Sequence, residues 1–385
     1  MLELSYTESP SSFAELMSLR RLPADESRIP SPDCAEHIER FQSLAPPYPP
    51  GEAGRAFGGH VYAQSAYAAS QTVDKGFLIH NVTGTFILPG RLDIPYEYRV
   101  RHLRDGKSYC TRAVDARQAH QICFSGLVSF KRAEPPAAAP FAHQPGSPQK
   151  RYAALLAGKK PQDFPVQPGV DADFYVEYWR EQWEKHGIPE REFPGLEARN
   201  VDMRTVNRRE EVRRQPDRYR QLTFYKLKGS PGDQPGSDSE GVGAGLALKE
   251  NGAVKELRHR ETEGEFDNLY ACAHMYAADK NSLVLIPRAL GMKVWDALAS
   301  LTLTVVFHEL GEAVRMVDWD AGAEAGAKEE GGLPKKWFIQ EGWTPRSGDS
   351  RAIHESWLWS PEGRLVATSY QDGMLKVARA DREKL

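Results

Sequence analysis

One carboxylate in this chain ends a segment that could deliver it to a reacting group. Asp279 closes the segment 268–279, NLYACAHMYAAD. Leu269, Ala273 and Tyr276 recur there at helical spacing, and the alanines predict a thin helix that a sheet can wrap closely. A carboxylate at the end of such a helix either caps backbone amides or faces a cleft as a base. The neighbouring residues leave both interpretations open.

Other reactive side chains are less informative. Cys34, Cys110, Cys123 and Cys272 are scattered in mostly apolar surroundings, without a C-x-x-C pair. This pattern predicts core thiols rather than disulfides, zinc ligands or a nucleophile, and we expect no metal site and no cofactor. No G-x-S-x-G sequence occurs, which argues against a serine hydrolase of that type.

Composition narrows the class of protein. The chain has 385 residues, of which 40% are hydrophobic and 27% charged, enough for two ordinary soluble domains. The net charge of -3 predicts neither nucleic acid nor an anionic membrane as partner. No apolar run of about 18 residues exists, and MLELSYTESPSSF is not a signal peptide, so we expect no membrane span and an intracellular protein. Glu383, Lys384 and Leu385 weakly resemble a peroxisomal address, which leaves cytoplasm and peroxisome open.

The first third of the chain predicts a helix covered by a sheet. After a short amphipathic helix at 13–20, the segment 55–73 enters a helix with paired Gly58 and Gly59 at its start. Apolar and β-branched runs separated by turn signals follow at 77–88, 94–103, 108–117 and 122–130. A helix followed by such a meander predicts a two-layer α+β unit with an antiparallel sheet.

The same order of elements recurs later in the chain. A Pro- and Ala-rich seam at 134–149 and a helix near 171–186 with an aromatic stripe come first. Strands are predicted at 200–207 and 219–228, before a Gly- and Ser-rich loop at 229–252 and the helix at 268–279. Further strands are predicted at 298–310, 335–343, 351–360 and 365–377, with an insertion at 318–335.

A short repeat supports two copies of one unit. RDGKS at 104–108 and RSGDS at 346–350 share R-x-G-x-S and fall between two predicted strands in each half. The simplest explanation is two similar folds paired as a pseudo-dimer. We divide the chain into a first domain at 1–133, a linker and helix at 134–198, and a second domain at 199–385 with insertions near 229–252 and 318–335.

Four stretches resemble the acyl-CoA thioesterase II (TesB-like) family. They are FGGHVYAQSAYAA, FILPG, LRDGKSYCTRAV and VATSYQDGML, beginning at residues 57, 86, 103 and 366. The family patterns there are similar to F-G-G-Q-x-x-x-Q-A, F-L-R-P-G, L-R-D-G-x-S-F-x-x-R and V-A-x-x-x-Q-E-G. The likeness covers most of both halves and leaves out the insertions. It implies an α+β double hot-dog fold, in which each central helix is wrapped by an antiparallel sheet.

The resemblance also implies a hydrolytic site in the second half. Asp279, Ser300 and Gln371 match the family's Asp, its Ser or Thr and its Gln, which together hold the hydrolytic water. The implied activity is hydrolysis of an acyl-CoA to a carboxylic acid and CoA, by a protein that pairs further into a homo-oligomer. The chain departs from the family pattern in several places. Thr302 and Leu303 replace Asp-His, Leu88 replaces Arg, and His60 stands where Gln is usual.

The chemistry needs a base, oriented water and donors for an oxyanion. Asp279 would accept the proton while Ser300 and Gln371 orient the water. Free N–H groups at a helix N-terminus suit a developing oxyanion, and we expect them from Gly58, Gly59 and His60 or from the start of the second central helix. His60 alternatively only hydrogen-bonds a loop.

Two other functions fit part of the pattern. A hot-dog enoyl-CoA hydratase also has an Asp followed two places later by Asn, but this chain has Ser282 and Val284 where that motif continues with Pro and a catalytic His. A non-catalytic acyl-CoA or acyl-carrier binding protein would keep the pocket without turnover. Arg104, Lys107 and Arg112 are candidate phosphate contacts that charge alone does not assign.

Overall fold

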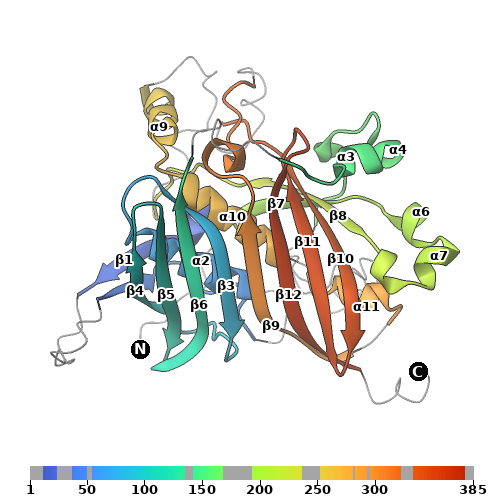
Figure 1. The fold of residues 1–385 in the computed structure, drawn as a ribbon, viewed down its shortest axis with the longest axis horizontal. Coiled ribbons are helices and arrows are strands. Elements are labelled where there is room, and N and C mark those ends of the chain that lie inside the picture. Colours follow the sequence, from blue (N-terminus) through green and yellow to red (C-terminus); the bar gives the residue numbers. More distant parts are fainter. Residues whose placement is uncertain are drawn as a thin grey trace.

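Two buried helices lie behind one curved antiparallel sheet (Figure 1). The computed structural model describes residues 12–23, 37–49, 54–134, 142–167, 193–235, 252–280, 282–292, 295–321 and 333–377. The predicted helix at 171–186, Cys34, the C-terminal tripeptide and most of both predicted insertions lie outside these residues. No helix among the described residues is long and apolar enough to cross a membrane.

The sheet has twelve strands in the order β1-β2-β4-β5-β6-β3-β9-β12-β11-β10-β8-β7. The strands of the first half are β1 (Leu19–Leu22), β2 (Ile38–Ser43), β3 (Phe77–Phe86), β4 (Glu97–Asp105), β5 (Tyr109–Gln118) and β6 (Gln121–Arg132). Those of the second half are β7 (Leu196–Asn200), β8 (Gln221–Leu227), β9 (Trp295–Phe307), β10 (Phe338–Gly348), β11 (Arg351–Trp359) and β12 (Leu365–Val377).

This order is symmetric about the seam between β3 and β9. Outward from the seam, β6, β5, β4, β2 and β1 on one side correspond to β12, β11, β10, β8 and β7 on the other. The two R-x-G-x-S segments therefore lie at equivalent hairpins, β4–β5 and β10–β11. The predicted arrangement of two similar units paired within one chain is confirmed, and the two half-sheets join edge to edge, so that neither leaves an open strand at the seam.

The central helices are α2 (Gly58–Ser70) and α10 (Asp267–Asp279). Both carry small and aromatic residues on every side, and nearly all of their residues are buried. A helix that is apolar all round belongs in a core, which is where the two lie, packed against each other and the sheet. The start of α2 meets the end of α10, because a Cβ on Gly58 would lie 3.1 Å from Asp279 Oδ2.

Close packing at the seam requires a glycine. Gly84 on β3 pairs with Leu303 on β9, and a Cβ on Gly84 would lie 2.1 Å from Cζ of Phe124. The Phe124 ring occupies that space instead. One step along, the Thr304 hydroxyl donates to the Thr83 hydroxyl across the seam at 3.1 Å. Backbone pairing and core packing thus join the two halves into one sheet.

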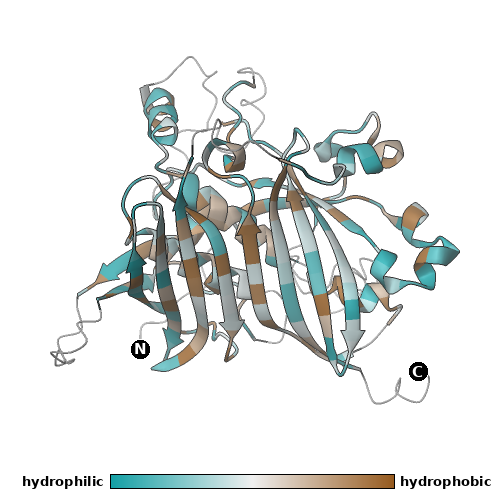
Figure 2. Cartoon of the chain, in the orientation of Figure 1, coloured by the Kyte–Doolittle hydropathy of each residue, from teal (hydrophilic) through white to brown (hydrophobic). Residues whose placement is uncertain are grey.

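The remaining described helices are short. They are α1 (Phe13–Leu16), α3 (Pro148–Arg151), α4 (Ala153–Leu156), α6 (Arg204–Asn207), α7 (Glu210–Arg213), α9 (Gly252–Thr262) and α11 (Leu285–Ala289), with 3-10 turns η2 (Pro161–Asp163), η4 (Pro216–Arg218) and η5 (Gly311–Val314). Colouring by hydropathy shows polar residues alternating with apolar ones along the sheet strands (Figure 2).

Two local predictions were wrong. The strand predicted at 200–207 ends at Asn200, and Arg204–Asn207 forms helix α6. The Asp202 carboxylate accepts from the Arg204 N–H at 2.9 Å, a local bond that turns the chain into a helix instead of a strand. The helix predicted at 13–20 ends at Leu16, because the chain enters β1 at Leu19 and pairs there with β2.

The prediction for the cysteines is confirmed where the structure describes them. Cys110, Cys123 and Cys272 are free thiols buried in the protein. Burial raises the pKa of all three thiols, which keeps them protonated and unreactive.

Candidate functional site

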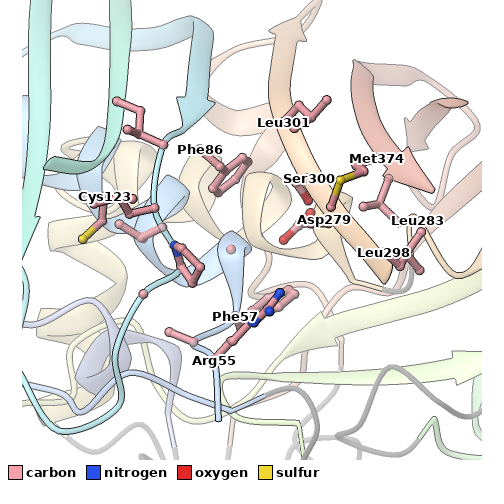
Figure 3. A pocket seen from close by; sticks show the side chains of 18 of the residues that line it. Arg55, Phe57, Phe86, Cys123, Asp279, Leu283, Leu298, Ser300, Leu301 and Met374 are labelled. Carbon is pink, nitrogen blue, oxygen red and sulfur yellow. The ribbon is translucent and has the colours of Figure 1, made fainter. Parts of the chain in front are cut away.

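A cavity of about 620 Å³ opens where the start of α2 meets the end of α10. Its walls are mostly apolar side chains from the end of β3, the start of β9 and the segment after α10. Figure 3 shows the oxygen atoms of Asp279 and Ser300 close together at the wall, with Phe86 on one side and Leu298 and Met374 on the other. A mostly apolar space with a few convergent polar groups is typical of a small-molecule site.

Three predicted residues meet at this wall. Gln371 Nε2 donates to Asp279 Oδ1 at 2.7 Å and to Ser300 Oγ at 2.8 Å. Asp279 lies in the last turn of α10, Ser300 on β9 and Gln371 on the adjacent strand β12. Folding thus brings Gln371 into contact with Asp279, 92 residues away in the sequence, and with Ser300, 71 residues away. Both hydrogens of the Gln371 amide are used to hold the other two side chains.

The three side chains differ in their access to the cavity. Asp279 and Ser300 line it, whereas Gln371 is fully buried behind them. Asp279 fixes the orientation of the Gln371 side-chain amide, because the flipped amide would place its oxygen against the carboxylate oxygen of Asp279. Gln371 Oε1 is left buried without a hydrogen-bond partner among the described residues. The amide therefore positions the acid and the hydroxyl, and the side chains that face the cavity are those of Asp279 and Ser300.

Ser282 adds a contact that the sequence analysis did not assign to the site. Its hydroxyl lies 2.9 Å from the Asp279 carbonyl oxygen and 3.4 Å from Oδ1. Ser282 is buried and lines the cavity three residues after Asp279. The signal available in the sequence was a hydroxyl residue just beyond a helix end, which often bonds the last turn.

The three oxyanion candidates lie in different surroundings. Gly58 lines the cavity beside Asp279, while Gly59 packs so closely on Phe57 that a Cβ would lie 2.6 Å from its ring. The N–H groups of both glycines have no acceptor among the described residues. The His60 N–H instead donates to the Phe57 carbonyl at 3.2 Å.

The His60 side chain points away from the cavity. Its ring is completely buried, and Nε2 lies 3.2 Å from the Leu16 carbonyl oxygen. Burial lowers the pKa of His60 to about 4, against the smaller opposing effect of that hydrogen bond. The imidazole is thus neutral and holds the N-terminal segment. The start of α10, the other candidate donor, does not line the cavity, and Asp267 there is paired with Arg315 at 2.8 Å.

Comparison with known proteins places these features in a family. Residues 45–131 match the acyl-CoA thioesterase N-terminal domain, and residues 256–375 match the acyl-CoA thioesterase C-terminal domain. The two matched regions together cover more than half of the chain and contain all three residues of the cluster. The chain belongs to the acyl-CoA thioesterase family. Its reaction class is therefore hydrolysis of an acyl-CoA thioester, as the sequence predicted.

Individual relatives are distant but extend over most of the chain. Acyl-coenzyme A thioesterase 8 of Mus musculus is 22% identical over 327 residues, which is 84% of this chain and 81% of that protein. Its Homo sapiens counterpart is also 22% identical, over 84% of this chain and 82% of its own length.

Solved structures share the fold. Acyl-CoA thioesterase II TesB2 from Mycobacterium marinum aligns with a TM-score of 0.57 at 19% identity, over 96% of this chain and all of that one. The tesB protein MAP1729c of Mycobacterium avium subs paratuberculosis aligns with a TM-score of 0.51 at 20% identity, over 87% and 92% of the two chains. The double hot-dog prediction is confirmed.

The departures from the thioesterase pattern lie at different distances from the site. Thr302 and Leu303 do not line the cavity, and Leu303 is fully buried in the core beside the seam. The cluster around Gln371 forms with Thr302 and Leu303 in place of the Asp-His of the family pattern described above. Leu88 does line the cavity and is 42% exposed, so the replacement of Arg there removes a positive charge from the rim.

The candidate phosphate contacts Arg104, Lys107 and Arg112 also differ in their position relative to the cavity. Arg112 is buried and donates to Thr72, to the Arg104 carbonyl and to Asp105, which makes it a structural residue. Neither Arg104 nor Lys107 lines the cavity. Arg55, which the sequence analysis did not single out, is the cation among the described lining residues.

The equivalent place in the first half has no such chemistry. Ser70 ends α2 as Asp279 ends α10. Counting from the paired Thr83 and Thr304 at the seam, Ile79 corresponds to Ser300. Val128, which faces Val82, corresponds to Gln371, which faces Leu303. Symmetric architecture therefore carries one polar cluster in the second half and apolar strand residues in the first.

Proposed function

We propose that this thioesterase hydrolyses acyl-CoA at the cavity, with a water held by Asp279 and Ser300 and with Gln371 as the residue that positions both. One observation carries the proposal. The buried Gln371 amide uses both of its hydrogens to bind an acid and a hydroxyl that face a mostly apolar cavity. A buried polar network that is only partly satisfied is costly, and here Gln371 Oε1 has no hydrogen-bond partner among the described residues while Asp279 and Ser300 are turned toward the cavity.

The residues support a balanced hydrolysis. The water oxygen bonds the thioester carbon while Asp279 takes one of its protons, and the carbonyl oxygen becomes an oxyanion. The Gly58 N–H at the start of α2, with that of Gly59 beside it, would donate to this oxyanion, favoured by the positive end of the helix dipole. Collapse breaks the C–S bond, and the proton held by Asp279 passes to the departing CoA thiolate.

The cavity lining suits an acyl chain. Phe86, Leu283, Leu298 and Met374 supply apolar surface next to Asp279. Arg55 at the same cavity would attract the phosphates of the CoA half, as guanidinium groups do. Arg55→Ala should raise KM about fivefold at unchanged kcat, and Arg104→Ala should leave KM as it was, since exposed ion pairs contribute about 1 kcal/mol. An equal rise in KM in both variants would remove Arg55 from this role.

The hydratase alternative lacks a residue that it needs. That reaction uses a histidine, and among the described residues none lines the cavity. The non-catalytic binding alternative differs only in turnover. Both are separated from hydrolysis by one assay, in which release of free thiol is followed for a panel of acyl-CoAs and enoyl-CoA hydration is followed in parallel.

Asp279→Asn is the decisive variant in that assay. We expect kcat to fall by about 10²–10⁴-fold, the range for loss of a general base, because the amide cannot take the proton. Asp267→Asn is a matched control, since Asp267 lies at the other end of the same helix and pairs with Arg315. Thiol release that survives in Asp279→Asn would refute the assigned site, and hydration without thiol release would favour the hydratase.

We also propose that the double units pair further into a homo-oligomer in the cytoplasm or the peroxisome. The resemblance to the thioesterase II family supports the first part, and the C-terminal Glu383, Lys384 and Leu385 support the peroxisome weakly. Light scattering after size exclusion should give a mass above 43.1 kDa. A monomeric mass would contradict the homo-oligomer. A fluorescent fusion whose location in the cell does not change when the tripeptide is removed would contradict the peroxisomal signal.

A further inference from the structure

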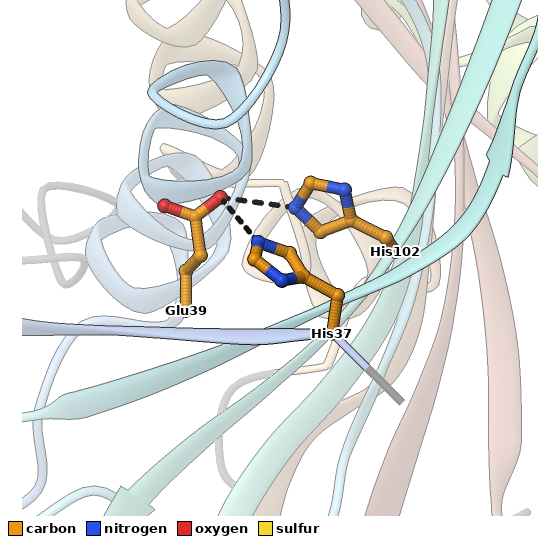
Figure 4. Close-up of side chains that lie close together, drawn as sticks. All are labelled: His37, Glu39 and His102. Atoms are coloured by element: carbon orange, nitrogen blue, oxygen red, sulfur yellow. Dashed lines mark hydrogen bonds and ion pairs between the residues drawn. The ribbon is translucent and has the colours of Figure 1, made fainter. Parts of the chain in front are cut away.

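A second group of side chains that can bind a ligand lies far along the sheet from the cavity. His37 precedes β2, Glu39 lies on β2, and His102 lies on β4 (Figure 4). None of the three lines the thioesterase cavity. Strand pairing brings them together. Ile38 pairs with Arg101, so His37 lies opposite His102, and the backbone N–H of His102 donates to the backbone carbonyl of His37 at 3.1 Å. Glu39, two residues after His37, points to the same side of the strand.

The three side chains converge on a small volume. Glu39 Oε1 lies 3.0 Å from His102 Nε2 and 3.6 Å from His37 Nε2, and all three atoms lie within 4.8 Å of one another. Zinc binds imidazole nitrogen and carboxylate oxygen at about 2.0–2.2 Å in a tetrahedron, which puts neighbouring ligand atoms about 3.3 Å apart. The observed separations lie on either side of that value, so small side-chain movements complete the geometry.

The surrounding residues orient two of the ligands. The other nitrogen of His102, Nδ1, lies 3.5 Å from Asp105 Oδ2, and Asp105 is held in turn by Arg112 at 2.6 Å. A carboxylate behind the second ring nitrogen is the arrangement that fixes a metal-binding imidazole. Glu39 Oε2 is paired with Arg21, which leaves Oε1 directed at the two rings.

A simple hydrogen bond explains only part of this arrangement. The 3.0 Å contact between Glu39 and His102 is a hydrogen bond, whereas the His37 nitrogen lies 3.6 Å from the same oxygen and the His37 ring packs edge-on against the His102 ring at 4.3 Å between centroids. Glu39 and Asp105 balance the charges of Arg21 and Arg112.

We propose that His37, Glu39 and His102 bind one divalent transition-metal ion, with zinc as the best match, and that the ion fastens the start of β2 to β4 near the edge of the sheet. Two histidines and one carboxylate are a ligand set that zinc, cobalt and nickel share, and water would complete the coordination. The sequence analysis predicted no metal site from the scattered cysteines and did not single out these residues, since H-x-E is a short pattern and the third ligand lies 63 residues away from Glu39.

Zinc titration by calorimetry tests the proposal on the full chain after chelator treatment. We expect one zinc per chain in the wild type, at least tenfold weaker binding in His37→Gln and in His102→Gln, and unchanged binding in the control His143→Gln, whose histidine is exposed elsewhere. Because the His37 side chain is 65% exposed, its replacement leaves the fold intact and keeps the test valid even if His102→Gln unfolds.

Thermal unfolding gives an independent reading. Zinc should raise the Tm of the wild type and of His143→Gln but not that of His37→Gln, since a ligand that binds only the folded state stabilises it. Thiol release should be the same with and without zinc, which separates this site from the proposed hydrolytic cluster. Wild-type binding no tighter than that of His37→Gln, or a Tm increase that persists in that variant, would overturn the proposal.

Discussion

At the scale of single residues, the site depends on the two hydrogen bonds that the Gln371 side-chain amide donates. Gln371 donates to both Asp279 and Ser300 and is itself out of reach of the cavity. Hydrogen bonds to a carboxylate favour its charged form, which is the form that can accept a proton from water. In the proposed mechanism, the Gln371 amide would act on the reaction through the acid and the hydroxyl that it holds.

Gln371→Ala should therefore change the pH profile as well as the rate. We expect kcat to fall about 10- to 100-fold, because geometry supplies much of the rate, and the acid limb of kcat/KM to move to higher pH as the carboxylate loses a donor. Steady-state kinetics across pH measure both effects. Gln340→Ala is the matched control, since this buried glutamine on β10 donates to the Ala278 carbonyl. A limb that moves equally in both variants would mean a structural role for Gln371.

At the scale of elements, the site lies where two helices meet end to end. The start of α2 and the end of α10 come from different halves of the chain, and Gly58 lies against both Phe86 and Asp279. The positive end of one helix dipole thus faces the position where an oxyanion would form. Neither half alone contains both the N–H donors and the acid.

Gly58→Ala should damage catalysis more than stability. The added methyl group would lie 3.0 Å from the Phe86 ring and 3.1 Å from Asp279 Oδ2, so the acid must shift by a few tenths of an ångström. We expect kcat to fall about tenfold or more, because small misplacements of reacting groups are costly. Gly252→Ala is the control: Gly252 is the first residue of helix α9, a Cβ there would meet no atom within 4 Å, and kcat should be unchanged. A normal kcat in Gly58→Ala would argue against a tight arrangement at the α2 start.

At the scale of the whole molecule, folding buries histidines that hold distant segments together. His60 on α2 binds the carbonyl of Leu16, and His274 on α10 binds that of Val314. Burial lowers the pKa of both to about 4, and that of His354 on β11 to about 3. Below pH 6.5 these histidines bind protons in the unfolded chain but stay neutral in the folded protein. The folded state therefore loses stability as the pH is lowered from about 6.5 to about 4.

His60→Gln should reduce this acid sensitivity. Between pH 7 and pH 5, His60 alone should cost the folded state about 2 kcal/mol, and glutamine, which does not titrate, removes that cost. Urea unfolding at the two pH values measures the difference. His143→Gln should keep the wild-type loss, because that residue is exposed. An unchanged loss in His60→Gln would show that His60 does not contribute to acid unfolding.

The sequence predicted the architecture well, because its signals are local or repeated. Helical spacing around Asp279, alternating strands and the doubled R-x-G-x-S each follow from the geometry of one element. The strand predicted at 200–207 failed, since the bond from Arg204 to Asp202 outweighs strand propensity there. The chemical types of Asp279, Ser300 and Gln371 came from the family resemblance, since no spacing along the chain connects them.

By itself, then, the sequence determined two similar α+β units and a thioesterase family, and it singled out three residues, Asp279, Ser300 and Gln371, that the structure brings together. Only the tertiary structure decided that Gln371 stands behind the other two, that His60 turns away while Gly58 faces the cavity, and that His37 lies opposite His102. The physical reason is that strand register and helix packing set these distances. Both depend on contacts between residues far apart in the chain, and local propensity carries no record of them.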